Sequence, residues 1–213
     1  MGQTGVVEGI VSGVCHTFLG FGSGANRAGF LFCTILVNEC LGFNFPLAEK
    51  MPRGRNFLGV GITAGTSEGI FEPEASCTRG QVVTFLWRAK GQPEPNTTVC
   101  PFTDVHTWDY FYKAVLWAYE NGITAGVSAT EFGPETTVDR GQVVTFMWRD
   151  AGMPGASVSN PFVDVANGIY YHDAVLWAYQ NGVTSGINAT EFGPANPCTR
   201  GQVVTFLYRA IGK

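Results

Sequence analysis

One stretch of the chain places apolar residues at helical spacing, namely Phe111, Ala114, Val115 and Ala118. This spacing predicts a short amphipathic helix whose apolar stripe faces a core. Asn121 and Gly122 follow directly, and this residue pair is a common helix stop. The same pattern returns over residues 174–179, so two such helices are expected.

A second kind of helix is predicted at three places. Each begins with Thr or Asp and carries Gln three residues later, as in Thr78–Gln81, Asp139–Gln142 and Thr199–Gln202. This arrangement is a capping box, which marks a helix N-terminus. The following residues place an apolar face on the helix, represented in the first copy by Val82, Val83, Phe85 and Leu86. Helices are therefore expected to start at residues 78–80, 139–141 and 199–201.

These elements belong to an internal repeat. The run Arg-Gly-Gln-Val-Val-Thr-Phe begins at Arg79, Arg140 and Arg200, at offsets of 61 and then 60 residues. A Gly-Ile/Val-Thr segment and a Phe-x-Pro turn precede each copy, and such residues punctuate helices without continuing them. Each full unit is thus predicted to be helix, loop, helix, as in arrays of supersecondary repeats.

The upstream half of the unit occurs only twice, as Phe-x-Asp-Val at residues 102–105 and 162–165. A third copy would fall near residues 41–61, which match the pattern only at the final Gly. The predicted organisation is therefore an unassigned apolar, Gly-rich segment over 1–60, a partial repeat over 61–91, and full repeats over 102–152 and 162–213.

Composition narrows the class of protein. Of the 213 residues, 45% are hydrophobic and 14% are charged, which supports a packed core and argues against disorder. The net charge of −4 makes a nucleic-acid partner improbable. The six cysteines form no Cys-x-x-Cys pair, which disfavours zinc. Cys77 and Cys198 share a repeat slot with Val138, so an apolar packing position is favoured over a disulfide.

The N-terminal segment carries separate expectations. Residues 10–26 are uncharged but too rich in Gly, Ser and Thr for a membrane span, so membrane insertion is disfavoured. We expect residues 1–60 to be a truncated, rearranged or mis-framed start of the array, with 1–45 poorly packed. Residues 46–51 could form a short substitute helix. The binding groove nearest Arg79 is then expected to be incomplete.

Together these motifs resemble the S-layer homology repeat. The resemblance covers residues 61–213 and implies an all-α fold, with tandem helix-loop-helix repeats in a pseudo-threefold helical module whose first repeat is incomplete. It also implies non-covalent attachment to secondary cell-wall polymers, often through a pyruvylated sugar. The family's Thr-Arg-Ala-Glu signature reads Thr/Asp-Arg-Gly-Gln here, so the Arg is kept and the acidic residue is lost.

The three arginines are the leading candidates for ligand binding. Arg79, Arg140 and Arg200 each occupy the first helical position, where a cation is disfavoured by the helix dipole by ~0.3–1 kcal/mol. Free N–H groups at a helix N-terminus together with a guanidinium would suit a carboxylate or phosphate. The alternative is a structural pairing with a neighbouring repeat's carboxylate, Asp104 or Asp164.

Other candidates are weaker. Gln81, Gln142 and Gln202 would support the arginines as caps. Asp104 and Asp164 are weighed evenly between helix capping and a place beside the ligand. Trp117 and Trp177 are expected in the core, whereas Trp108 could stack on a sugar ring. The three histidines, at 16, 106 and 172, occupy unrelated slots, so a metal or catalytic histidine is not expected, and no nucleophile or phosphate-loop motif occurs.

The expected function is anchoring to a bacterial cell wall by binding an anionic polysaccharide, with no cofactor and no catalysis. Its site residues would be the three arginines, the three glutamines and the two aspartates. The alternative is a structural surface-layer protein that self-associates without recognising a specific glycan. Either function places the chain outside the cell at the wall, although Met1 to Thr4 show no export signal.

Overall fold

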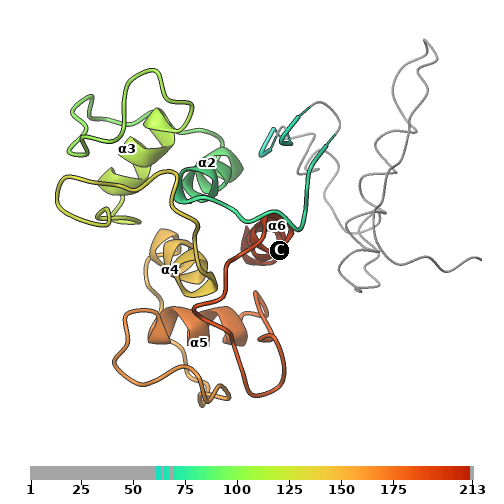
Figure 1. The fold of residues 1–213 in the computed structure, drawn as a ribbon. Coiled ribbons are helices and arrows are strands. Elements are labelled where there is room, and N and C mark those ends of the chain that lie inside the picture. Colours follow the sequence, from blue (N-terminus) through green and yellow to red (C-terminus); the bar gives the residue numbers. More distant parts are fainter. Residues whose placement is uncertain (1–60, 64, 68–69, 212–213) are drawn as a thin grey trace, which may run out of the picture.

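The computed structural model describes residues 61–63, 65–67 and 70–211, and within them the chain forms five helices and no multi-residue strand. The helices are α2 (Arg79–Ala89), α3 (Tyr112–Glu120), α4 (Arg140–Asp150), α5 (His172–Gln180) and α6 (Arg200–Ile211). Helices α2, α4 and α6 lie side by side at the centre, and α3 and α5 lie outside them (Figure 1). The predicted all-α, pseudo-threefold repeat module is confirmed.

The three central helices begin where the capping pattern places them. The full reciprocal box forms at α2, where the Thr78 hydroxyl accepts from the Gln81 amide and the Gln81 side chain accepts from the Thr78 amide. At α4 the Asp139 carboxylate accepts from the Gln142 amide, and at α6 Thr199 does so from Gln202. In these two helices, however, no bond from the Gln side chain back to the cap residue forms, so the box is only half made.

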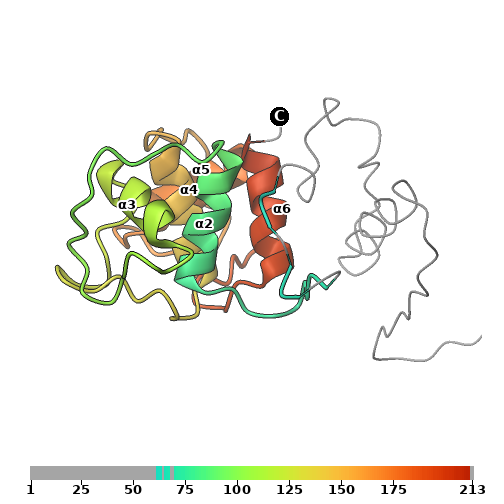
Figure 2. The same ribbon diagram turned by 90° about the horizontal axis from the view of Figure 1, so that it is seen from above.

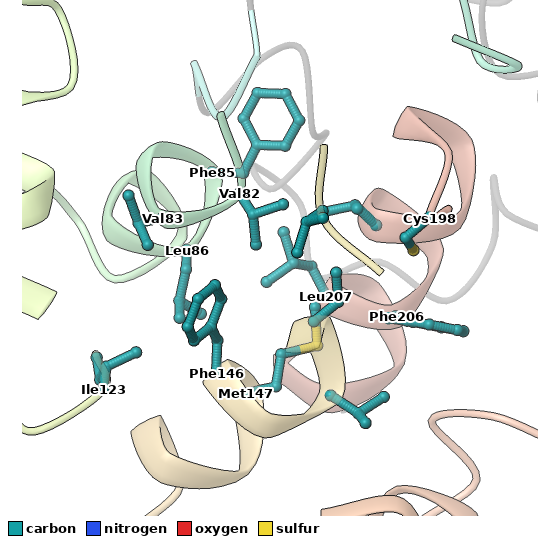
Figure 3. Packing of buried hydrophobic residues seen from close by; sticks show 14 of the residues in the cluster. Val82, Val83, Phe85, Leu86, Ile123, Phe146, Met147, Cys198, Phe206 and Leu207 are labelled. Carbon is teal, nitrogen blue, oxygen red and sulfur yellow. The ribbon is translucent and has the colours of Figure 1, made fainter. Parts of the chain in front are cut away.

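The core lies between the three central helices. Val82 and Leu86 of α2 lie toward Phe146 and Met147 of α4 and Leu207 of α6, and all are buried (Figure 3). Burial of such side chains is worth about 1.5–3 kcal/mol each, which makes this cluster the main source of stability. Trp117 and Trp177 are buried on the outer helices, as the sequence predicts.

The repeats interlock. Helix α3, which belongs to the second repeat, packs against α2 of the first, and α5 of the third repeat packs against α4 of the second (Figures 1 and 2). Each outer helix therefore covers the central helix of the preceding unit. Contacts between neighbouring repeats therefore stabilise the module, as they do in other repeat proteins.

Residues before the central helices close a ring around the pseudo-threefold axis. The Cys77 amide donates to the Cys198 carbonyl at 3.0 Å, Val138 to Cys77 at 3.0 Å, and Cys198 to Val138 at 2.9 Å. These three residues are fully buried, and both cysteines are free thiols, which confirms the packing interpretation of this slot. Burial raises the pKa of Cys77 and of Cys198 to about 12, so both stay protonated and unreactive at neutral pH.

Several expectations concern residues outside the described part of the chain. They are the poor packing of residues 1–45, the substitute helix over 46–51 and the disfavoured membrane span over 10–26. Within the described ranges, none of the helices has the length and apolar character needed to cross a membrane.

Glu72 occupies a strained backbone conformation in the first repeat. Its φ is +53°, while the matching residues of the other repeats are Gly133 and Gly193, at +69° and +70°. A side chain in the left-handed region costs roughly 1–2 kcal/mol, and glycine escapes this cost. The partial first repeat thus has the same turn geometry as the other two repeats, but it carries Glu72 where they carry glycine.

We expect Glu72→Gly to raise the free energy of unfolding by about 0.5–1 kcal/mol, because relief of strain exceeds the extra entropy of the unfolded chain. Glu74→Gly is the matched control, since Glu74 is exposed in the same loop and has no positive φ. The control should lose stability by up to about 1 kcal/mol. Urea unfolding of both variants measures the difference, and a loss of stability in Glu72→Gly would contradict this account.

Candidate functional site

Each central helix begins inside the loop of the next repeat, and we call these three places the junctions. At the Arg79 junction the Arg79 and Gly80 amides donate to the Thr136 and Pro134 carbonyls at 3.0 and 2.9 Å. The Arg140 and Arg200 junctions repeat this pattern with the loops of the third and first repeats. The expectation of free N–H groups at these helix ends is therefore wrong, because neighbouring backbone carbonyls use them.

The three guanidinium groups are buried in the junctions. The Nε atoms of Arg79, Arg140 and Arg200 donate to the carbonyls of Phe132, Phe192 and Phe71 at 2.9, 3.0 and 2.9 Å. Each guanidinium also lies over two phenylalanine rings at 4.8 to 5.4 Å, a cation–π arrangement. Each arginine thus joins two repeats through a hydrogen bond from Nε and two aromatic contacts.

Burial changes the acid–base properties of these arginines. It lowers the pKa of Arg79 and of Arg140 from the usual value, since the charged form loses hydration. Guanidinium groups nevertheless stay protonated in proteins, so the charge is retained inside the junction. None of the three arginines forms an ion pair with a carboxylate in the described part of the chain.

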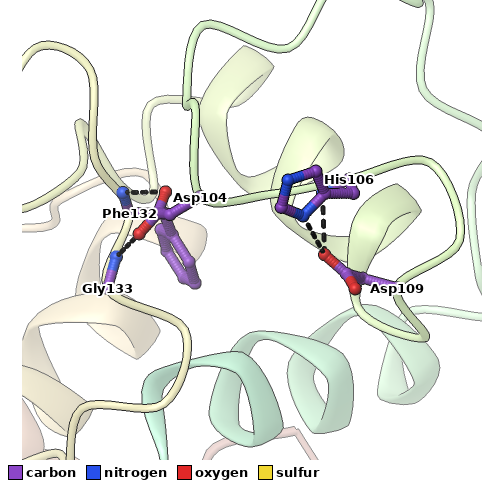
Figure 4. A network of polar contacts seen from close by, with 5 residues as sticks. All are labelled: Asp104, His106, Asp109, Phe132 and Gly133. Carbon is purple, nitrogen blue, oxygen red and sulfur yellow. Dashed lines mark hydrogen bonds and ion pairs between the residues drawn. The ribbon is translucent and has the colours of Figure 1, made fainter.

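Asp104 and Asp164 bind loops instead of capping helices. Asp104 accepts from the Phe132 and Gly133 amides at 2.8 and 2.7 Å (Figure 4). Asp164 accepts from Phe192 and Gly193 at 2.9 and 2.7 Å. Helix α3 has no side-chain cap at all. The helix-capping interpretation of these aspartates is therefore wrong.

A single peptide group links each aspartate to an arginine. The Phe132–Gly133 peptide accepts from Arg79 through its carbonyl and donates to Asp104 through its N–H. The predicted direct pairing of the arginines with Asp104 or Asp164 is therefore replaced by an indirect one. Because both hydrogen bonds involve an ionised group, both are of the stronger, charge-assisted kind.

Glutamine side chains connect two of the junctions across the repeats. The Gln202 Oε1 accepts from Arg140 Nη1 at 3.3 Å, and the Gln81 Oε1 accepts from Arg200 Nη1 at 3.4 Å. By symmetry Gln142 should accept from Arg79, but Gln142 Oε1 and Arg79 Nη2 are buried without partners. The Arg79 junction therefore holds one unused acceptor and one unused donor.

The junctions also differ in charge. Asp139 replaces the Thr of the other copies, and desolvation raises its pKa although Arg79 opposes this effect. Tyr170 lies near both groups, and its pKa is raised to about 12, chiefly by burial and then by Asp139. At the Arg200 junction the contacts are all neutral, from Phe71, Gln81 and Thr63. Arg200 makes more hydrogen bonds than Arg79 or Arg140, whose Nη2 atoms are buried without partners, but all of its hydrogen bonds are to neutral groups.

The loop of the half repeat contacts one junction only among the described residues. The loop of the half repeat docks at Arg200, through the Phe71 carbonyl, and does not touch the Arg79 guanidinium. In the described residues, the amide of Glu72 has no carboxylate like those bound to Gly133 and Gly193. The prediction of an incomplete groove beside Arg79 depends on packing by residues 1–60, which lie outside the described residues, so it stays a prediction.

Sequence reasoning missed the loop carbonyls and the tyrosines beside them. The Phe-x-Pro turn recurs at the same offset as the Arg, which could have indicated that the two motifs meet. Nothing in the linear pattern showed that each Arg pairs with the following repeat, and that the last repeat returns to the first. That pairing depends on the closed ring.

Comparisons with known proteins agree with this architecture. Residues 101–144 and 161–204 match the family model of the S-layer homology domain. An endoglucanase of Bacillus sp. (strain KSM-635) is 31% identical over 117 residues, 55% of this chain and 12% of that protein. The surface-layer 125 kDa protein of Lysinibacillus sphaericus is 27% identical over 164 residues, 74% of this chain and 14% of that protein.

A third relative, a cell surface protein of Thermoanaerobacter kivui, is 36% identical over 58 residues, 27% of this chain and 8% of that protein. The chain thus spans at most 14% of the length of these relatives. The repeated motif, the interlocked helices and the family match agree with one another. Residues 101–144 and 161–204 therefore match the S-layer homology domain as two successive repeats.

Proposed function

We propose that this module anchors its protein to the bacterial cell wall by binding an anionic, pyruvylated or similar, secondary wall polysaccharide. The relatives support this role because their names differ so widely. One is an endoglucanase and two are surface proteins, yet each shares only a small fraction of its length with this chain. A module shared by an enzyme and two surface proteins is suited to a role that all three can use, and attachment at the cell surface is such a role.

The observation that carries the anionic preference is the state of Arg200. Arg200 is 3% exposed, and its hydrogen bonds go only to neutral groups. A buried charge without a counter-charge is costly, so an anionic group bound beside this junction would lower the free energy of the complex. The helix dipole of α6 adds positive potential at the same end.

The structure changes which atoms we assign to the ligand. Because the arginine side chains are buried, we propose that they act mainly through their charge and through the loops that they hold. Gln81, Gln142 and Gln202, which are half-buried, would provide direct polar contacts. Asp104 and Asp164 would hold the loop backbones in place, as their paired amide contacts indicate.

We expect the full chain to be retained by purified wall sacculi and to lose most of that retention on sacculi stripped of their secondary polymer. The attraction is electrostatic in part, so retention should also decrease as salt rises toward 1 M, where the Debye length is about 3 Å. A co-sedimentation assay with both wall preparations measures this. Equal retention on the two preparations would contradict polymer recognition.

The same assay tests the self-assembly alternative. If the module is a structural surface-layer protein, it should form large species in sedimentation velocity without any wall present. If it is an anchor, it should stay small until polymer is added. Released polymer added in solution serves as the competitor, and it should displace only a specifically bound protein.

A further inference from the structure

Trp108 is exposed to an unusual degree. It is 79% exposed, whereas Trp87, Trp117 and Trp177 are buried and Trp148 is half-buried. A large aromatic ring left in water gives up the burial energy that the other four tryptophans gain. Because tryptophan is enriched at interfaces, the exposed Trp108 ring is a candidate for contact with another molecule.

The Trp108 ring is held in place by its neighbours. The His106 imidazole stacks on it, with ring centroids 4.6 Å apart and planes 10° apart. The Asp109 carboxylate accepts from the His106 amide at 2.7 Å and lies 3.4 Å from its Nδ1 (Figure 4). The Asp109 amide donates back to the His106 carbonyl at 3.0 Å. One face of the indole is therefore covered and fixed, and its exposure leaves the opposite face open to solvent.

The chemistry around the ring favours a sugar as the occupant. Its sequence neighbours His106, Thr107 and Asp109 are polar, and the next exposed aromatic residue along the chain is Tyr110. A protein or membrane contact requires a wider apolar patch. A pyranose ring fits better, because it presents an apolar C–H face bordered by hydroxyl groups that Thr107, His106 and Asp109 could bond.

The third repeat shows that the fold does not need this arrangement. There the residues matching His106, Trp108 and Asp109 are Ala166, Gly168 and Ile169, yet α5 forms as α3 does. Gly168 has a φ of +80°, so the third repeat makes a different turn. Trp108 is therefore a specific feature of the second repeat, and packing does not explain it.

We propose that Trp108, backed by His106 and oriented by Asp109, is a stacking platform for one pyranose ring of the wall polysaccharide. This inference rests on the proposed function and adds to it a site that only the second repeat supplies. It predicts a neutral, aromatic contribution to affinity that high salt does not remove, unlike the contribution of Arg200.

The test compares Trp108→Ala, Trp108→Phe and Val163→Ala in the full chain. Val163 is the matched control because it is 80% exposed in the third repeat. The probe is polysaccharide released from sacculi, titrated while tryptophan fluorescence and bound protein are measured. Trp108→Ala should bind about tenfold more weakly, Trp108→Phe should fall between, and the control should match the parent chain.

The outcomes separate the two proposals. If the parent chain and Trp108→Ala bind equally, the platform is wrong and the anchoring role stands. If the parent chain binds no polysaccharide, both are wrong. Thermal unfolding should be unchanged in Trp108→Ala because the side chain is exposed, so weaker binding with unchanged unfolding supports the platform. Weaker binding with a lowered unfolding temperature in both Trp108 variants would overturn it.

Discussion

Arg140→Ala is expected to destabilise the module by about 3 kcal/mol, a larger effect than any expected loss of a surface contact. The substitution removes a charge-assisted bond to the Phe192 carbonyl and leaves that carbonyl buried without its donor. It also removes cation–π contacts to Phe192 and Phe206 and opens a space between the repeats. Thermal unfolding should shift down by about 10 °C in a domain of this size.

Two further variants separate the causes. Arg140→Met keeps much of the volume but loses the hydrogen bonds, so it should recover part of the stability. Lys113→Ala is the surface control, since its ion pair with Glu94 is exposed and should contribute at most about 1 kcal/mol. An Arg140→Ala protein as stable as the Lys113→Ala protein would contradict the structural role assigned to the buried arginines.

Gly126→Ala is expected to cost more than about 3 kcal/mol. Gly126 has a φ of +87°, and a Cβ there would lie 2.5 Å from the Ser128 and Glu131 carbonyl oxygens and 2.6 Å from a Phe102 ring carbon. Two of these atoms belong to the backbone, so the turn itself would have to move. The destabilisation should extend to the two hydrogen bonds that Asp104 accepts from the Phe132 and Gly133 amides, because this turn precedes Phe132.

Gly122→Ala provides the matched control for this prediction. Gly122 also has a positive φ, +67°, but a Cβ there would meet nothing within 4 Å. It should therefore show only the left-handed backbone cost of about 1–2 kcal/mol. Urea unfolding of the two variants isolates the steric part. Equal losses in both would mean that the turn relaxes around the added methyl group.

The sequence predicts the helices well because the signals are local. Thr78 with Gln81 places a helix start to within one residue, and Asn121–Gly122 places a helix end. The candidate site is less predictable because it depends on contacts between residues far apart. A cation such as Arg140 is unusual at a helix N-terminus, and its hydrogen-bond partner is a peptide carbonyl 52 residues away and not a carboxylate.

The role of Asp104 was also not predictable from local sequence signals. Its position before a predicted helix favoured capping, which is a local role. In the structure it binds amides 28 and 29 residues later. Trp108, in contrast, was noted from sequence alone as a side chain able to stack on a sugar, because its neighbours are polar.

The closed ring of backbone bonds also has a consequence for how the protein folds. The bond between Arg200 and the Phe71 carbonyl joins residues 129 positions apart, and the Cys77 amide must likewise reach Cys198. Bringing these residues together lowers the conformational entropy of the long chain segment between them, and this loss precedes the gain from the contact. During synthesis the first repeat therefore cannot complete its contacts until the last repeat has been made. Until then, the surfaces that become buried in the ring stay exposed to solvent. We expect a single, comparatively slow closing step, after which the module resists partial opening.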